Sequence, residues 1–217
     1  SQHDYYAMQA FVAGVEYADR ELDPADAKRR RSESAKLKKE LADLDNHLAR
    51  FTPLTASGAT RPAINARLNT DRFTPVQTKR VRFTIHATNK LEPCIDELEI
   101  FDSEGNNLAL ASRGATVTSS GSKTQKNRHE LRFLNDGRYG NSRSWMSNQT
   151  GTGWVEVELA KTAEIQRIAW GRDREGKFAD RLATEYTIEV ADEQGEWTQV
   201  ADASDRAPFD SGKSKPL

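Results

Sequence analysis

The spacing of apolar side chains changes near residue 76, and this change constrains the fold more than any other feature. Beyond it, Val81, Phe83 and Ile85 alternate with charged or polar neighbours. The same alternation returns at residues 98–100, 155–159, 168–170 and 186–190. A period of two places successive side chains on opposite faces of a strand, so each segment buries one face. Short strands of this kind, separated by Gly, Asn and Asp turns, predict a mainly β chain folded as an antiparallel β-sandwich.

Two helices are predicted before the strands. Apolar side chains recur at helical spacing in the first, at Tyr5, Met8, Phe11, Val12 and Val15, with Asp4 available as a cap. The second begins with Asp23 as N-cap and Pro24 at the first helical position, and it carries leucines at 37, 41, 44 and 48. Because the connection at residues 21–23 is short, we expect an antiparallel helical hairpin or coiled coil over residues 1–51, with the two apolar stripes facing each other.

The remaining boundaries follow from where periodicity stops. Residues 52–75 are rich in Thr, Ala, Asn and Pro without a sustained period, which predicts a linker. The alternating segments then define a sandwich over residues 76–205 and leave residues 206–217 as a C-terminal tail. The four tryptophans, at 145, 154, 170 and 197, are expected in or at the edge of the core.

Composition excludes several classes of function. Thirty-two basic residues nearly balance 33 acidic ones, so the net charge of -1 gives no long-range attraction to nucleic acid or anionic lipid. No apolar run approaches the ~18 residues that would cross a bilayer. Cys94 is the only cysteine, which excludes a Cys-based zinc site or a haem attachment motif within these residues. The sequence holds no Gly-x-Ser-x-Gly elbow and no paired catalytic motif, so we do not expect an enzyme.

A longer pattern connects the alternating segments. "RFLNDGRYGNSRSWMS" (132–147), "GWVEVELAK" (153–161) and "YTIEVADEQGEW" (186–197) follow one another. This order resembles the discoidin, or coagulation-factor type C, domain of the galactose-binding-like superfamily. The family's closing strands stand here as "TKRVRFTI" (78–85) and "CIDELEIF" (94–101), ahead of its opening strand. The resemblance therefore implies a circularly permuted, discoidin-like jelly-roll sandwich of eight strands.

The whole chain also resembles segments of planctomycete-type cytochrome-c-domain proteins, which are large and multidomain. This resemblance implies an extracytoplasmic location in the periplasm or cell envelope. It also implies that neighbouring domains of a longer parent chain are partners. The Cys-x-x-Cys-His motif is absent, so no haem is expected in this segment.

The discoidin resemblance implies a structural calcium ion in the Asp-Gly loop. By motif, its ligands are the Asp136 and Glu97 carboxylates, the carbonyls of Phe133 and Arg138, and the hydroxyl of Ser142 or Ser144. A serine is invoked because Arg143 stands where the family has threonine. Calcium prefers six to eight hard oxygens, which a turn closed by glycine can present. The alternative is a plain Asn-Asp-Gly turn in which Asp136 binds backbone amides.

The same resemblance implies a sugar site in "WGRDREGKFADRL" (170–182). Arginines contact hydroxyls or anionic groups and an aromatic ring stacks on the sugar, which assigns ligand contacts to Arg172, Arg174, Lys177, Phe178, Arg181 and Tyr139. Lys177 and Ala179 stand where the galactose-binding members have asparagine, which argues against galactose. The many guanidinium groups of this stretch suit an acidic or sulfated glycan instead. The alternative is an Arg/Asp network that braces a long loop.

Together these observations predict a noncatalytic, carbohydrate-binding module within a larger extracytoplasmic protein. The competing interpretation is a structural spacer or interdomain interaction module with no soluble ligand. An exposed aromatic ring beside unpaired arginines at one end of the sandwich would favour binding. A loop closed by its own salt bridges would favour the spacer.

Overall fold

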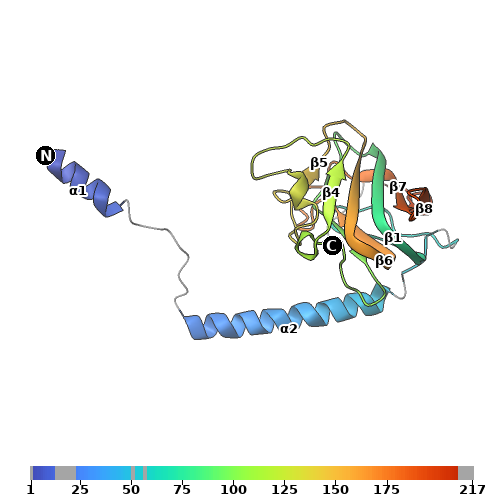
Figure 1. Cartoon of the computed structure of the whole chain (residues 1–217), viewed down its shortest axis with the longest axis horizontal. Helices are drawn as coiled ribbons and strands as arrows, with labels where there is room; N and C mark the ends of the chain where they lie inside the picture. The colour runs from blue at the N-terminus through green and yellow to red at the C-terminus, as the bar shows by residue number, and fades with distance from the viewer. Residues whose placement is uncertain (1, 13–22, 50–51, 56–57, 210–217) are drawn as a thin grey trace. The chain divides into compact units, whose positions relative to one another are not determined.

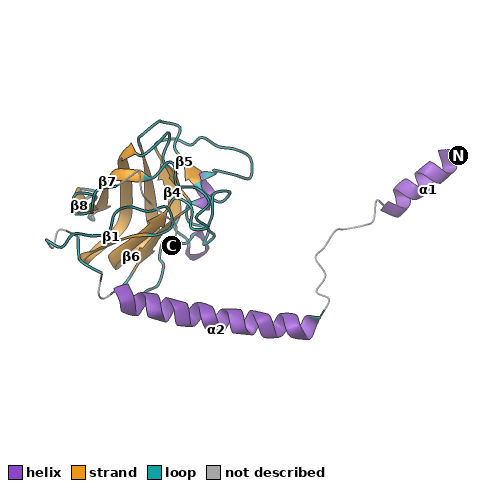
Figure 2. Ribbon diagram, turned by 180° about the vertical axis from the view of Figure 1, so that it is seen from behind, coloured by secondary structure: helices purple, strands orange, loops and turns teal. Residues whose placement is uncertain are grey.

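A computed structural model describes residues 2–12, 23–49, 52–55 and 58–209 (Figures 1 and 2). The chain divides into two compact units, at residues 1–45 and 46–217. The first unit is helical and the second is mainly β. Each is described by itself below.

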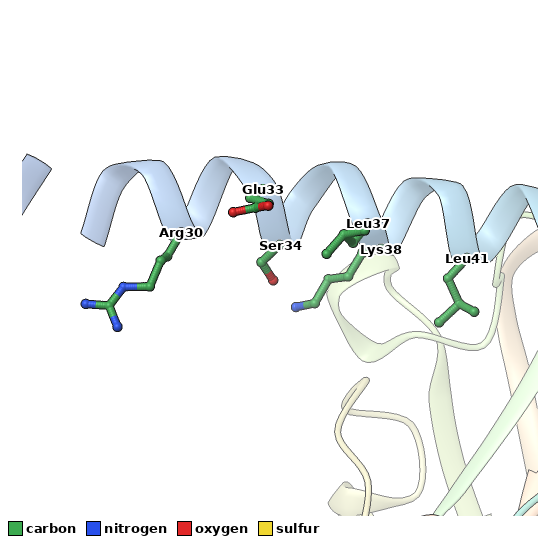
Figure 3. Close-up of a pocket in the computed structure, with 6 residues that line it drawn as sticks. All are labelled: Arg30, Glu33, Ser34, Leu37, Lys38 and Leu41. Atoms are coloured by element: carbon green, nitrogen blue, oxygen red, sulfur yellow. The ribbon is translucent and has the colours of Figure 1, made fainter. Parts of the chain in front are cut away.

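The helical unit contains α1, Gln2–Val12, and α2, Pro24–Ala49. Asp23 caps α2 as predicted, because its Oδ1 accepts the backbone N–H groups of Ala25 at 3.0 Å and Asp26 at 3.1 Å. The predicted mutual burial of the two stripes is not found among the described side chains. The four leucines of α2 are 58–61% exposed, and Tyr5 and Met8 of α1 are exposed as well. Figure 3 shows the side of α2 that carries the first two of these leucines.

Part of the hairpin prediction lies outside the described residues. Val15 and the connection at residues 21–22 belong to that part of the chain, and the side chains of Phe11 and Val12 are not described. What the structure supports is two helices, each held by its own backbone hydrogen bonds and, for α2, by a cap.

The second unit is built from antiparallel strands. They are β1 (Asn69–Thr88), β2 (Cys94–Ile95), β3 (Glu97–Phe101), β4 (Thr116–Ser119), β5 (Trp145–Met146), β6 (Gly153–Gly171), β7 (Ala183–Ala191) and β8 (Trp197–Asp202). Two 3-10 turns, η1 (Ala111–Arg113) and η2 (Leu131–Phe133), lie between them. The main sheet has the order β3-β6-β1-β7-β8 with β4 also on β6, and β2 pairs separately with β5.

The two longest strands organise this sheet. β1 and β6 pair from Asn69 opposite Trp170 to Ile85 opposite Gly153, with irregularities between Arg72 and Val76 and between residues 78 and 80. Such bulges bend a strand pair. The two halves of β6 accordingly take different neighbours, β4 at residues 155–158 and β3 at residues 167–171. The result is the predicted mainly β, antiparallel architecture with a sandwich-like form around one apolar core.

The alternation of apolar and polar residues along the strands correctly predicted residues of the core. Val81, Phe83 and Ile85 are fully buried, and the Phe83 ring packs against Trp170 and Tyr186 with centroids 5.0 Å away in each case. Aromatic rings at this separation contribute beyond the area that they bury.

The prediction for the tryptophans is right for Trp145 and Trp170, which are buried, and wrong for Trp154 and Trp197. Trp154 precedes buried Val155, so the strand places it on the outward face. There the Arg82 guanidinium lies 5.2 Å from the Trp154 ring and 4.2 Å from the Trp197 ring. These two tryptophans therefore shield a cation on the polar side of the sheet.

The predicted linker and tail both need correction. β1 begins at Asn69 within the supposed linker at residues 52–75, and Ile64 and Phe73 are buried in the core. At the other end, Ala207 donates its backbone N–H to the Arg61 carbonyl at 2.8 Å, within the supposed tail at 206–217. The β unit is thus wider than residues 76–205 at both ends. Residues 210–217 of the tail lie outside the described part.

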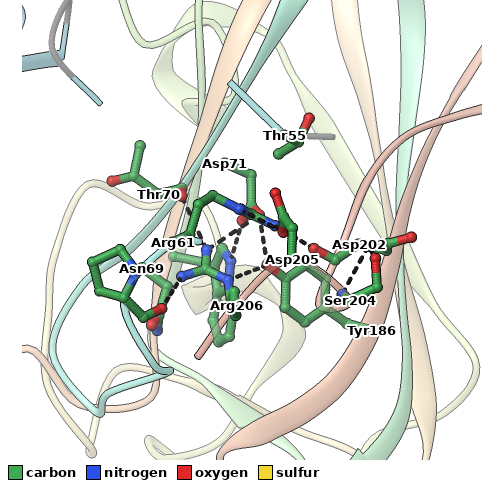
Figure 4. A network of polar contacts seen from close by, with 12 residues as sticks. Thr55, Arg61, Asn69, Thr70, Asp71, Tyr186, Asp202, Ser204, Asp205 and Arg206 are labelled. Atoms are coloured by element: carbon green, nitrogen blue, oxygen red, sulfur yellow. Dashed lines mark hydrogen bonds and ion pairs between the residues drawn. The ribbon is translucent and has the colours of Figure 1, made fainter. Parts of the chain in front are cut away.

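A buried polar network joins these two ends (Figure 4). The Asp71 carboxylate pairs with the guanidinium groups of Arg61 and Arg206, and its Oδ2 accepts the Trp170 indole N–H at 2.9 Å. The Tyr186 hydroxyl also donates to Asp71. The buried side chains at these two ends of the β unit are polar. The sequence therefore shows no apolar period there that would have predicted these segments as part of the fold.

Candidate functional site

The two loops that carry the predicted sites lie against each other. The Asp-Gly loop, residues 134–144, connects η2 to β5, and the basic loop, residues 172–182, connects β6 to β7. Arg172 Nη1 donates to Asn141 Oδ1 at 2.8 Å across the two loops. Gly140 faces Glu175 so closely that a Cβ there would lie 2.8 Å from its carboxyl carbon. The candidate calcium and sugar residues are therefore brought into one region of the β unit.

The basic loop is closed by a buried carboxylate. Asp173 accepts the backbone N–H groups of Glu175 at 3.2 Å, Lys177 at 2.9 Å and Phe178 at 3.0 Å. An aspartate that binds successive backbone amides fixes a turn without any partner from another element. The loop therefore has a defined shape of its own.

Arg172 is a brace and not a ligand contact, which corrects the sequence prediction. Its residue surface is only 2% exposed. The guanidinium donates to the Asp180 carbonyl and to Asp180 Oδ1, both at 3.0 Å, besides Asn141. Arg181 forms ion pairs with Asp180 and with Glu92, although its buried Nε has no hydrogen-bond partner among the described residues. A guanidinium whose donors are satisfied inside the protein has none to offer a ligand.

Arg174 backs the ring of Tyr139. Its backbone N–H donates to Asp96 Oδ2 at 2.6 Å, and its guanidinium pairs with Glu99 and lies 4.4 Å from the centroid of the Tyr139 ring. The Tyr139 hydroxyl donates to Glu99 Oε1 at 3.1 Å. Partial burial and the Glu99 charge raise the pKa of Tyr139 to about 12, so the hydroxyl keeps its proton. The ring is held from one side and remains 43% exposed.

Phe178 is the second exposed ring, also 43% exposed, with the Arg172 guanidinium 5.4 Å from its centroid. Lys177 next to it is exposed and pairs with Glu175 at 2.7 Å.

Arg67 was missed by sequence reasoning because it lies in the supposed linker. Its guanidinium lies against Gly176, where a Cβ would collide with it, and it makes no ion pair with any described residue. We call Tyr139, Phe178 and Arg67 the aromatic edge.

The Asp-Gly turn brings together the two carboxylates predicted to share calcium. Asp136 Oδ1 accepts the Arg138 backbone N–H at 2.9 Å, and Glu97 Oε1 accepts the N–H of Gly137 at 3.0 Å. The other Asp136 oxygen pairs with the guanidinium of Arg143. That guanidinium also lies 4.0 Å from the centroid of the Phe133 ring. A cation from the protein itself therefore already neutralises Asp136.

Glu97 is fully buried, and its Oε2 has no hydrogen-bond partner among the described residues. Burial raises its pKa to about 9, and the negative charges of Glu99 and Asp136 add to the effect. Burial likewise raises the pKa of Asp96, despite the backbone N–H groups that it accepts. A protonated Glu97 accounts for a carboxyl group that is buried without a cation.

In this structure a guanidinium stands beside Asp136, and the shared calcium ion stays a prediction. Asp136 pairs with Arg143, and burial raises the pKa of Glu97. Ser142 is exposed, while the Ser144 hydroxyl donates to the Asn141 carbonyl at 2.9 Å. Within the residues that the structure describes, no cluster of three or more His, Cys, Asp or Glu side chains could hold a metal. The contacts match the alternative of a closed Asp-Gly turn, with Arg143 as its counter-ion.

A buried polar cluster beneath this loop was not foreseen. The Ser144 hydroxyl lies 2.8 Å from His129 Nδ1 and 3.4 Å from Cys94 Sγ. Burial lowers the pKa of His129 to about 4 and raises that of the Cys94 thiol, so both groups are neutral near pH 7. A neutral buried thiol is a poor nucleophile. No sequence motif joins these residues, which are separated by 35 and 15 positions (129 − 94 and 144 − 129).

Comparison of the chain with protein-family models, with curated proteins and with solved structures found no match. Among the described residues, no helix is both long and apolar enough to cross a membrane. The discoidin resemblance therefore rests on its motifs, and function has to be argued from the geometry of the two loops.

Proposed function

We propose that the β unit is a noncatalytic binding module that holds carbohydrate on its aromatic edge. The observation that carries the proposal is the exposure of Tyr139 and Phe178, each 43%, on two loops that buried contacts hold in place. Sugar rings present apolar C–H faces that stack on aromatic rings, while their hydroxyls need polar groups nearby. An aromatic ring on a rigid loop loses little entropy when it binds.

The ligand class follows from the charges left at this edge. The arginines first assigned to an anionic glycan, Arg172, Arg174 and Arg181, are paired inside the protein. We assign contact with an anionic group of the glycan to Arg67 instead. Its guanidinium lies beside Gly176, the residue is exposed, and it forms no ion pair among the described residues. Preference for an acidic or sulfated glycan thus depends on Arg67. The resemblance also implies that the protein lies outside the cytoplasm as part of a longer chain, and this stays a prediction.

A structural spacer is the second candidate, and one observation favours it. The basic loop satisfies its own charges, through Arg172 with Asp180 and Lys177 with Glu175. Self-closure of this kind gives a rigid connection between β6 and β7 without any ligand. The two candidates differ in one respect: a spacer has no use for exposed aromatic rings.

A binding experiment separates them. A glycan array with neutral, sulfated and uronic-acid polysaccharides identifies a ligand, and calorimetry measures its affinity for the wild type, Tyr139→Ala and Phe178→Ala. Truncating a stacking ring should weaken binding about tenfold, equivalent to ~1.4 kcal/mol. Leu91→Ala is the matched control, since Leu91 is 52% exposed and lies outside both loops. Absence of any bound glycan supports the spacer, whereas a glycan bound with equal affinity by all variants would show that it binds away from these two rings.

A salt titration tests the charge preference. Arg67→Ala should weaken binding of a sulfated glycan and leave a neutral one unchanged, and rising salt should weaken only the former, because exposed charges are screened over about 8 Å at physiological ionic strength. Arg113→Ala, which removes an exposed arginine from η1, is the control. Equal loss for both glycans would show that Arg67 holds the loop and does not read charge.

A further inference from the structure

The helix α2 presents an apolar stripe of four exposed leucines. Leu37, Leu41, Leu44 and Leu48 are each 58–61% exposed and lie four, three and four residues apart. This is the spacing of the d and a positions of a heptad, with Leu37 and Leu44 at d and Leu41 and Leu48 at a. Leu37 and Leu41 project from the same side of the helix as Ser34 in Figure 3. A contiguous exposed leucine row of this kind marks an interaction surface.

The charges beside the stripe carry opposite signs on its two flanks. Over residues 26–40, the g positions are acidic, at Asp26, Glu33 and Glu40, and the e positions are basic, at Arg31 and Lys38. In a parallel two-stranded coiled coil, each g residue faces the following e residue of the other helix. Glu33 would face Lys38 of a second helix, and Asp26 would face its Arg31. These two pairs are complementary, whereas the next g position, Glu40, would face the acidic Asp45 of the other helix within the leucine seam.

We propose that a second copy of this chain covers the stripe, with the two α2 helices paired in parallel through their leucines. Glu33 and Lys38 are exposed and form no ion pair among the described residues, so both can pair across a dimer. The helix α1 fits less well as the cover. Residues 2–12 contain Asp4 but no lysine or arginine, so α1 has no lysine or arginine to pair with the acidic g positions of α2.

The pairing is short, which sets its strength. Toward the start of α2 the next d and a positions are Arg30 and Ser34, so the apolar seam is confined to the four leucines. The helix α2 is 26 residues long, but an apolar seam of about two heptads buries little area when two such helices pair. The dimer should therefore be reversible and depend on concentration.

Sedimentation equilibrium of the full 217-residue chain tests the proposal. The mass should rise from 24.3 kDa toward twice that value as concentration increases from micromolar to near millimolar. Leu41→Glu should keep the mass at that of the monomer, whereas Leu91→Glu, an exposed leucine of the β unit, should dimerise like the wild type. A wild type that stays monomeric throughout, or association that survives Leu41→Glu, overturns the proposal. Melting of the β unit, followed by near-ultraviolet circular dichroism, verifies that each variant is folded.

Charge exchange tests the parallel register. Glu33→Lys and Lys38→Glu should each weaken association several-fold, because each places like charges opposite one another twice per dimer. The double variant should recover wild-type association, since it restores both pairs with exchanged signs. Two weakened single variants without recovery in the double variant would refute the parallel pairing.

Discussion

Replacing Glu97 by glutamine should remove a loss of stability that we expect as pH rises from about 5 toward about 9. Glu97 is buried in the folded β unit, and its pKa rises from an ordinary 4.5 to about 9. Between these two values the folded state keeps a proton that the unfolded chain has released. The free energy of unfolding therefore falls as pH rises through this window. Glutamine has no proton to exchange and should show no such fall.

The magnitude follows from the size of the shift. One pKa unit corresponds to about 1.4 kcal/mol, so this single group lowers the free energy of unfolding by up to ~1.4 kcal/mol per pH unit. From about pH 5 to about pH 8, the stability of Glu97→Gln relative to wild type should increase by up to ~4 kcal/mol. The amide oxygen can still accept the Gly137 N–H, and the amide nitrogen can donate toward the carboxylates that disfavour an ionised Glu97.

Urea denaturation at several pH values between about 5 and 8 measures this difference for both proteins. Glu193→Gln is the control, because Glu193 is exposed in the turn between β7 and β8 and should change nothing. Comparison of variant with wild type at each pH cancels the contributions of all other titrating groups. A difference that stays constant across this range would refute the reasoning, because it would mean that Glu97 is ionised in the folded protein.

The same titration decides the calcium question. A divalent ion at Glu97 would need the carboxylate form, so binding would release its proton and flatten the pH dependence. We expect the same slope with calcium and with a chelator, since Arg143 already neutralises Asp136. A flattened slope together with a higher melting temperature in calcium would restore the metal site predicted from the sequence.

Three further predictions concern polar side chains of the β unit. Arg143→Met should lower the free energy of unfolding by about 1–2 kcal/mol, because it removes the Asp136 pair and the contact with the Phe133 ring, and urea denaturation beside Arg113→Met measures it. His129→Asn should abolish a loss of stability between about pH 6.5 and 4, where the buried imidazole stays neutral while the unfolded chain takes up a proton; thermal melts across that range test this. Asp71→Asn should cost about 3–5 kcal/mol in the same urea assay, since it leaves buried guanidinium groups without their shared carboxylate.

The strands that were predicted correctly bury apolar side chains, and the stretch that was missed buries polar ones. In β1, residues 69–73 alternate between buried and partly exposed as regularly as residues 81–85 do. The buried positions are Asn69, Asp71 and Phe73, of which only the last is apolar. A hydrophobic period cannot reveal such a segment. Only the tertiary partners of Asp71, which come from the two ends of the unit, make its burial favourable.

The sequence predicted the two loops correctly, but it did not predict which residues their charged side chains pair with. It recognised that the basic loop is rich in guanidinium groups, and it left open whether they bind a ligand or brace the loop. The answer depends on pairs that are distant in sequence, such as Arg174 with Glu99 and Arg172 with Asn141. Local spacing carries no information about these pairs. Arg174 was predicted to contact a ligand, and only the three-dimensional structure shows that it supports the ring of Tyr139.

Bracing and binding are therefore not competing descriptions of these loops. The guanidinium of Arg174 fixes one side of the Tyr139 ring, and the pairing of Arg172 fixes the loop that presents Phe178. Holding an aromatic ring still before a ligand arrives reduces the entropy lost on binding, which is how a rigid support raises affinity without touching the ligand. Loops that only connected η2 to β5 and β6 to β7 would gain stability by turning Tyr139 and Phe178 inward. Both rings remain 43% exposed, and in the proposed function they are the groups that the ligand would contact.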